Sequence, residues 1–126
     1  FYLPNGVAVA SDGSVYVSEK NIHRIKKFDS GGVFVRKWGY QGSGDGQFNF
    51  PTSVAVASDG SVYVTDMNNM RIQKFTSEGV FVSKWGARGS GDGQFEGAYG
   101  VAVASDGSIY VADTFNHRIQ KFSMGP

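Results

Sequence analysis

The sequence has no cysteine and only 3 prolines among its 126 residues. Without cysteine it has no disulfide framework, zinc–thiolate site or thiol nucleophile. No apolar run approaches the ~18 residues that cross a bilayer, and no signal-peptide pattern opens the chain, so we expect no membrane partner. No stretch has the i, i+3, i+4, i+7 apolar spacing of a helix. An excess of charge of one sign is also absent, since 12 Lys and Arg face 11 Asp and Glu.

What is present indicates a folded β-rich domain. Hydrophobic residues make up 40% of the chain and charged residues only 18%, which excludes disorder caused by low hydrophobicity. The chain is long enough for one domain with a real core. Because it begins at Phe1 rather than at methionine, we expect it to be part of a longer protein.

The dominant feature is an internal repeat of 47 residues. The segment VAVASDGSVYV begins at Val7, recurs at Val54 and returns at Val101 with one change, valine to isoleucine. Residues 1–47 and 48–94 are identical at 32 positions. A period of this length is typical of solenoids, propellers and arrays. We therefore divide the chain into repeats 1–47 and 48–94 and a partial third repeat, 95–126.

Each repeat predicts four short antiparallel strands. In the first repeat they are residues 7–10, 15–17, 24–28 and 33–38, rich in Val, Phe, Tyr and Ile and separated by turn signals such as Ser-Asp-Gly-Ser. The third repeat ends before its fourth strand, so eleven strands are expected. A four-stranded meander cannot bury both of its apolar faces alone, and radial stacking of such sheets is the β-propeller. The fold class is therefore all-β, with about three propeller blades.

The repeats also resemble a known family. The third repeat has NHRI at residues 116–119, where the second has NMRI at 69–72 and the first IHRI at 22–25, each after a VAVASDG segment. Segments 38–48 and 85–95 share the pattern Trp-Gly followed by Gly-Asp-Gly-Gln-Phe. In these motifs the whole chain resembles the NHL repeat. The resemblance implies a propeller, most often six-bladed, and functions that range from protein or RNA binding to some related lyases and hydrolases.

Three blades do not close a ring, so two sheet faces are expected to stay open. Standard strand dimensions give each face about 300–400 Å². At about 25 cal/mol/Å², covering one would contribute up to roughly 8–10 kcal/mol before association costs. We therefore expect the chain to self-associate as a homodimer or larger ring, or to join the remainder of a longer propeller.

The most variable part of the repeats lies on one face, which we call the loop face. It comprises the loops between the second and third strands of each repeat and the crossovers between repeats. These segments differ while the ASDGS turns at the other end are identical, and rigid scaffolds carry binding residues on such loops. The candidate binding residues are Lys20, His23, Tyr40, Phe50, Met67, Asn69, Arg88, Tyr99, Phe115 and His117.

Other motifs have simpler structural interpretations. Acidic and basic residues recur at one spacing in every repeat and are expected to form structural ion pairs: Glu19 with Arg24, Asp66 with Arg71, and Asp113 with Arg118. The two histidines lie two blades apart, about 20 Å at sheet spacing, too far to share a metal. The glycine-rich segments 42–46 and 89–93 precede no helix, so we expect crossover turns rather than phosphate sites. No metal or other cofactor is expected.

These observations favour a non-catalytic binding and assembly scaffold, with no catalytic residue and a protein as the partner of the loop face. An RNA-binding NHL domain is the first alternative, and it is less favoured because the basic residues of this face are matched by acidic ones. A fragment of a propeller lyase or hydrolase is the second. Such an enzyme would need several acidic or histidine side chains at the channel mouth, where the first strands offer mostly Val, Ala, Gly and Ser.

Overall fold

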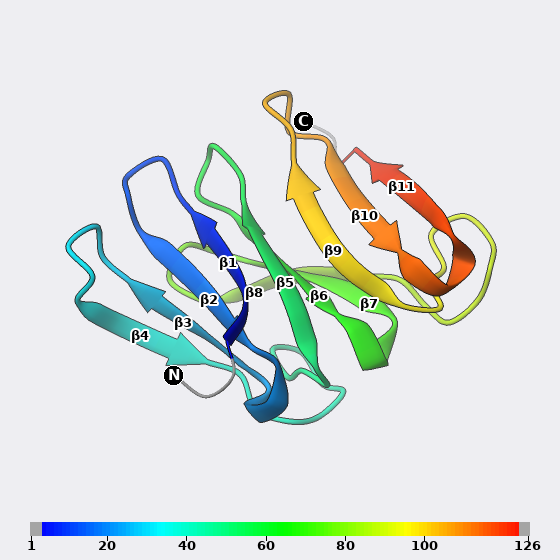
Figure 1. Ribbon diagram of the computed structural model, residues 1–126, viewed down its shortest axis with the longest axis horizontal. Helices are drawn as coiled ribbons and strands as arrows, with labels where there is room; N and C mark the ends of the chain where they lie inside the picture. The colour runs from blue at the N-terminus through cyan, green and yellow to red at the C-terminus, as the bar shows by residue number, and fades with distance from the viewer. Residues whose placement is uncertain (1–3, 124–126) are drawn as a thin grey trace.

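Three antiparallel sheets follow one another along the chain, as the predicted repeats require (Figure 1). The computed structural model describes residues 4–123. The first sheet contains β1 (Pro4–Val9), β2 (Val15–Glu19), β3 (Arg24–Phe28) and β4 (Phe34–Trp38). The second contains β5 (Pro51–Val56), β6 (Val62–Asp66), β7 (Arg71–Phe75) and β8 (Phe81–Trp85). The third contains β9 (Ala98–Val103), β10 (Ile109–Asp113) and β11 (Arg118–Phe122).

The strands of each sheet pair in sequence order, β1-β2-β3-β4 in the first and β5-β6-β7-β8 in the second. The all-β propeller prediction is thereby confirmed. The first strand of the first repeat, predicted at residues 7–10, occupies Pro4–Val9 instead, with a bulge between Pro4 and Gly6. The bulge allows the strand to begin at a proline, which has no N–H to give to a regular ladder.

The loops after the second strands contain short helices that the sequence patterns did not predict. They are the 3-10 helices η1 (Lys20–Ile22), η2 (Met67–Asn69) and η3 (Thr114–Asn116). Each ends at a residue in the left-handed conformation, with φ of 54–55°. A single turn of three residues is too short to carry an apolar periodicity, so pattern analysis cannot detect it. No helix within residues 4–123 is long and apolar enough to cross a membrane.

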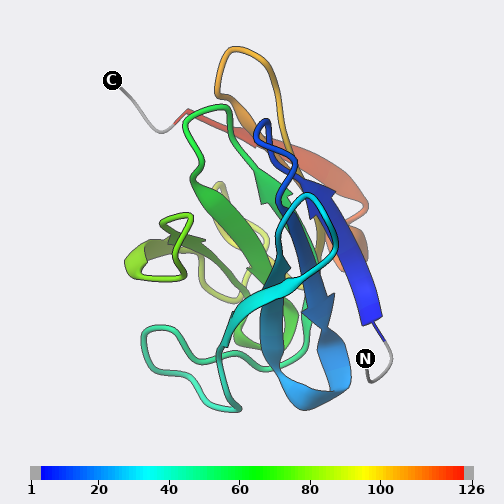
Figure 2. The ribbon, with the colours of Figure 1, turned by 90° about the vertical axis from the view of Figure 1, so that its left-hand side faces the viewer.

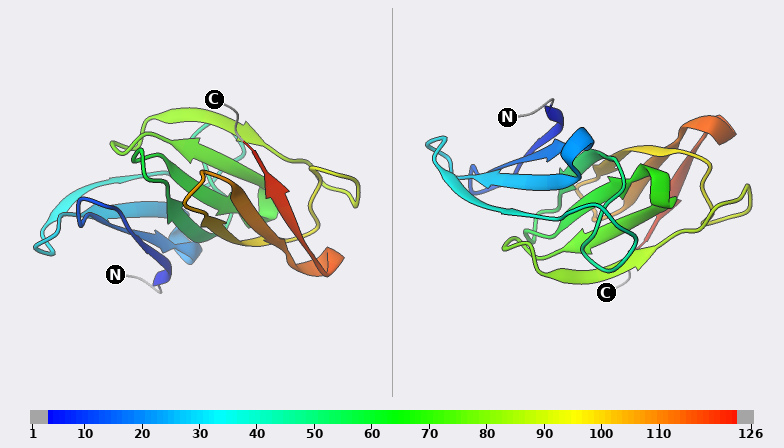
Figure 3. Two further views of the ribbon diagram at one scale, coloured as in Figure 1. Left: turned by 90° about the horizontal axis from the view of Figure 1, so that it is seen from above. Right: turned by 90° about the horizontal axis from the view of Figure 1, so that it is seen from below.

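The sheets pack face to face, and the side chains that meet come from corresponding positions of successive repeats. The front face of a blade points to the next blade and carries Tyr16 and Ile25 in the first blade. The rear face points to the preceding blade and carries Val54, Val64 and Phe75 in the second. These five side chains are at most 4% exposed and belong to one core cluster. Figure 3, from above and below, shows the three sheets succeeding one another across the molecule.

A second cluster repeats the same packing between the second and third blades. Tyr63 and Ile72 on the second front face meet Ile109 and Val111 on the third rear face. Aromatic rings add to each contact, with Trp38 lying 5.6 Å from Phe75 between ring centroids. The molecule therefore contains two copies of one blade–blade interface.

The two ends of the blades differ in their loops. The ASDGS turns gather at the upper end in Figures 1 and 2, while the crossovers and the 3-10 helices lie at the opposite, lower end of each blade. In the turns, Asp12 accepts the Ser14 N–H at 2.8 Å, and Asp59 accepts the Ser61 N–H at 2.9 Å. Hydrogen bonds from these serines lower the pKa of Asp12 and Asp59. The lower end is the loop face defined from the sequence.

Candidate binding face

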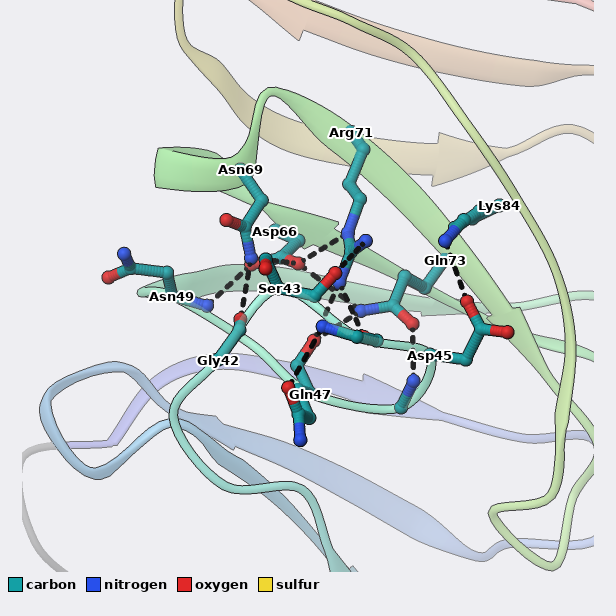
Figure 4. A network of polar contacts seen from close by, with 12 residues as sticks. Gly42, Ser43, Asp45, Gln47, Asn49, Asp66, Asn69, Arg71, Gln73 and Lys84 are labelled. Atoms are coloured by element: carbon teal, nitrogen blue, oxygen red, sulfur yellow. Dashed lines mark hydrogen bonds and ion pairs between the residues drawn. The ribbon is translucent and has the colours of Figure 1, made fainter.

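Four polar side chains of the second blade organise the loop face. Asp66 ends β6, Asn69 lies in η2, and Arg71 and Gln73 lie on β7. Strand pairing places Asp66 opposite Arg71, and their Oδ2 and Nε atoms form an ion pair of 2.8 Å. Figure 4 shows these side chains meeting the crossover that joins the first blade to the second. We call the four residues the second clamp.

Arg71 binds the main chain of this crossover. Its Nη1 donates to the carbonyl of Ser43 at 2.9 Å, and its Nη2 donates to the carbonyls of Gly44 at 2.9 Å and Gln47 at 3.0 Å. A phosphate site requires N–H groups that point toward the ligand. Here the carbonyls face an arginine, so the glycine-rich segment forms a crossover turn, as the sequence indicated.

The remaining clamp residues complete the attachment. Gln73 Nε2 donates to the Gln47 carbonyl at 2.6 Å, while its Oε1 accepts the Gly46 N–H at 2.9 Å. Asp66 Oδ1 accepts the Asn49 N–H at 2.7 Å, and its Oδ2 accepts from Asn69 Nδ2 at 2.9 Å. The Asp66 side chain is fully buried, so these donors and Arg71 replace the water that its charge has lost.

The third blade carries a copy of this arrangement, the third clamp. It consists of Asp113, Asn116, Arg118 and Gln120, and it binds the crossover at residues 89–94. Burial alone would raise the pKa of Asp113, but hydrogen bonds from Asn116, the Glu96 N–H and Arg118 outweigh it and hold the pKa below its ordinary 3.8. Asp113 therefore remains a carboxylate at neutral pH.

The first blade keeps the ion pair but changes the rest of the clamp. Glu19 and Arg24 lie 2.8 Å apart, so all three predicted ion pairs form. Lys26 replaces the clamp glutamine and places its Nζ 3.6 Å from Glu19 Oε1. Ile22 stands where the other clamps have asparagine. This first clamp has no side-chain amide at either position.

His23 belongs to the packing between η1 and the first crossover. Its Nδ1 accepts the Phe50 N–H at 3.0 Å, and the two rings lie 5.1 Å apart between centroids. His117 is exposed on the third blade. Within residues 4–123, no three histidine, cysteine, aspartate or glutamate side chains form a group that could hold a metal.

The remaining candidate residues differ in exposure. Tyr40, Tyr99 and Phe115 are 66%, 42% and 69% exposed, and the Phe115 ring lies over Gly97. Arg88 is exposed, with its Nη1 4.0 Å from Glu96 Oε2. Lys20 and Met67 are half-buried in η1 and η2. The three aromatic side chains are the largest apolar groups that this face offers to a partner.

The amide residues of the clamps have a structural role that the sequence patterns did not indicate. Asn69 was predicted to bind a partner, but its Nδ2 donates to the Gly42 carbonyl at 2.9 Å as well as to Asp66. Gln73 and Gln120 were not singled out. Both amide types recur at the 47-residue spacing in the second and third repeats, together with the glycine-rich segments, and this joint recurrence is the signal that was available.

The architecture defines a class: successive four-stranded meanders stacked front to rear are blades of a β-propeller. A family model for the NHL repeat matches residues 1–28, 48–75 and 95–122. The chain belongs to the NHL repeat family. A search of curated proteins found no match.

Solved structures with the same fold come from proteins of several kinds. The WD40 β-propeller domain of Doa1 matches 97% of this chain with a TM-score of 0.73 at 16% identity, over 37% of its own length. A streptogramin B lyase matches 98% with a TM-score of 0.69 at 16% identity, over 41% of its length. Virginiamycin B lyase from Staphylococcus aureus matches 98% at 0.65 and 17% identity, over 42%. The chain thus spans less than half of each of these proteins, and the likeness concerns the fold.

Proposed function

We propose that this chain is a non-catalytic propeller scaffold that binds a second copy of itself through its two open sheet faces. The first rear face exposes Val7 and Val9, 67% and 66% accessible, whereas Val54, the second-repeat copy of Val7, is 4% accessible. On the third front face Ile119 is 66% accessible, whereas Ile72 is fully buried. Both open faces therefore carry the side chains that are buried where blades meet inside the chain.

This correspondence is the observation that supports self-association. The third front face presents Tyr110 and Ile119, which have the same identities and strand positions as Tyr16 and Ile25. The first rear face carries Val7, Val17 and Phe28, the counterparts of Val54, Val64 and Phe75; Val7 is exposed, whereas Val17 is already 7% accessible in the single chain. A front face and a rear face already pack together twice within the chain. The same two faces should therefore be complementary when they belong to two different chains. A two-fold pair would use this contact twice and bring six blades into one ring.

Light scattering on chromatographed protein tests the proposal. The wild-type chain is expected at twice its 13.6 kDa mass. Val9→Asp places a carboxylate in the contact and should give the single-chain mass, because an unpaired charge is costly to bury. Val33→Asp is the matched control: Val33 is 64% exposed but lies in the β3–β4 turn, so the dimer should persist. A wild-type monomer, or equal loss with Val33→Asp, would contradict the proposal.

We further propose that the loop face binds a protein through Tyr40, Tyr99 and Phe115. Exposed aromatic side chains on a rigid frame are typical anchors of protein interfaces. The polar residues of the second and third clamps are already engaged with crossovers, which leaves the aromatic groups as the prominent contacts. Affinity capture with wild type and with a Tyr40→Ala/Phe115→Ala variant of unchanged mass tests this. Partners retained equally by both, or a salt-sensitive affinity for RNA in filter binding, would contradict it.

A further inference from the structure

One hydrogen bond of the loop face has a titratable acceptor, and it holds the first crossover at Phe50. The main-chain N–H of Phe50 donates to His23 Nδ1 at 3.0 Å, and the two rings lie 5.1 Å apart between centroids. An imidazole nitrogen accepts a hydrogen bond only while it carries no proton, so His23 is neutral in this contact. Since histidine gains a proton between about pH 8 and 5, acid can remove this acceptor.

The main chain at Phe50 is strained where this bond forms. Phe50 has a φ of 60°, in the left-handed region, which costs a bulky side chain about 1–2 kcal/mol. It also precedes Pro51, and a residue before proline favours extended backbone with φ near about −120°. Such a conformation persists only where its surroundings hold it. Here His23 binds the Phe50 N–H, and the Met67 N–H donates to the Phe50 carbonyl at 3.2 Å.

The second crossover shows the same position without the histidine contact. Its residue is Gly97, whose φ lies outside the left-handed region. The Gly97 carbonyl still accepts an N–H, from Thr114 at 3.0 Å, as the Phe50 carbonyl does in the first crossover. Met70, which stands where the first blade has His23, has no nitrogen acceptor. The repeat therefore accommodates a different main chain at this position, and the left-handed turn accompanies the histidine.

The charged groups around His23 offer little compensation for a proton on its ring. Each carboxylate of the elements that adjoin it is already ion-paired: Glu19 with Arg24 and Lys26, Asp45 with Lys84, and Asp66 with Arg71. The other titratable groups of these elements are the ammonium of Lys20 and the phenol of Tyr40. A proton on Nδ1 would therefore turn the acceptor into a donor aimed at the Phe50 N–H, without a new ion pair to offset the lost bond.

We propose that His23 is an acid-sensitive latch that holds Phe50 and the first crossover to the first blade. Near neutral pH the imidazole binds the Phe50 N–H and keeps the two rings together. Toward about pH 5 the imidazole takes up a proton, the bond breaks, and the main chain relaxes toward the extended conformation that Pro51 favours. The Phe50 ring then leaves His23 and turns to the loop face. The latch lies between the first two blades, so it does not depend on what covers the open sheet faces.

Amide exchange measured by NMR on the isotope-labelled wild-type chain tests the latch without any substitution. Protection factors are compared at about pH 8 and pH 5, because they remove the intrinsic pH dependence of exchange. The protection of the Phe50 amide should fall about 3- to 10-fold toward acid, as the loss of one hydrogen bond predicts. The Glu96 amide of the second crossover, bound to Asp113 at 3.0 Å, should keep its protection. Cross-relaxation between the His23 and Phe50 rings should weaken over the same range.

Substitutions at the two histidines assign the response. His23→Asn is the matched variant, because asparagine tolerates the left-handed conformation of residue 23 and its Oδ1 accepts an N–H without titrating. In this variant the protection of the Phe50 amide should be equal at both pH values. His23→Met, which installs the second-repeat residue, should give low protection at both, and His117→Asn should leave the wild-type response unchanged. A flat wild-type profile, a response that survives His23→Asn, or an equal loss at Glu96 would overturn the proposal.

Discussion

The clamps allow one substitution to be compared at two equivalent positions of the repeat. We predict that arginine to alanine destabilises the chain more at Arg71 than at Arg24. The Arg71 side chain is 8% exposed and its partner Asp66 is fully buried. Removing the guanidinium leaves Asp66 with only neutral hydrogen-bond donors and takes away three hydrogen bonds to crossover carbonyls. Breaking a buried ion pair in this way costs about 3–5 kcal/mol.

The cost at Arg24 is smaller. Its side chain is 26% exposed, and its partner Glu19 keeps a second cation, Lys26, at 3.6 Å. Within residues 4–123 the Arg24 side chain donates one hydrogen bond, to Glu19. Loss of one charged hydrogen bond whose acceptor remains compensated costs about 1–2 kcal/mol.

Urea unfolding at one chain concentration measures the difference. Since m is about 1–3 kcal/mol/M for a small protein, a gap of about 2–3 kcal/mol separates the two midpoints by roughly 0.7–3 M. Hydrogen exchange adds a local readout: amides at residues 42–47 should exchange faster in Arg71→Ala and not in Arg24→Ala. Equal midpoints, or a greater loss with Arg24→Ala, would refute the argument that burial and the crossover determine the cost.

Three further substitutions or conditions test other parts of the structure. Gly79 and Gly32 are equivalent residues with φ of +84°, but a Cβ at Gly79 would lie 2.6 Å from the Trp38 ring while one at Gly32 meets nothing. In urea unfolding, Gly32→Ala should lower the free energy of unfolding only by the left-handed backbone penalty, about 1–2 kcal/mol. Gly79→Ala should lower it by about 1–3 kcal/mol more, because the new methyl group meets the Trp38 ring. Equal costs would exclude the ring contact. The urea midpoint should fall as the pH falls below 3.8. The pKa of Asp113 is lower in the folded chain than its ordinary 3.8, so the ionised carboxylate stabilises the fold above that pH and this stabilisation is lost on protonation. A flat profile between about pH 5 and 2 would contradict this. Gln73→Lys, which installs the first-repeat residue, removes the acceptor of a crossover N–H and should speed exchange at residue 46 while Lys26→Gln leaves it unchanged.

The fold was predictable because the same strand and turn pattern recurs in every repeat, and each recurrence supports the others. One run such as VYV indicates a strand only loosely, but VYV twice and IYV once at a fixed spacing, always after Ser-Asp-Gly-Ser, indicate a hairpin and its two faces. The ion pairs were predictable for a related reason. Asp66 and Arg71 lie opposite each other across a short loop, so their separation along the chain reports their separation in space.

The crossover attachments were not predictable in the same way. Arg71 binds the carbonyls of Ser43 and Gly44, 28 and 27 residues earlier. A main-chain carbonyl acceptor cannot be recognised from the sequence, because every residue has one. The contact between His23 and Phe50 spans 27 residues and likewise uses a main-chain group. Only the side-chain partner of each of these contacts, such as Arg71 or His23, can be identified from the sequence.

The differences in the first clamp bear on how two copies would meet. A crossover like residues 42–47 needs an acceptor for the Gly46 N–H and an amide donor for the Gly42 carbonyl. Lys26 has no acceptor atom and Ile22 has no polar group, so the first blade cannot hold such a crossover as the second does. Glu19 replaces the clamp aspartate and both clamp amides are lost, while Val7 and Val9 of the rear face keep the residue types of the second repeat. In the self-association that we propose, a junction at the first blade would therefore be held by the apolar faces of the sheets rather than by clamp amides.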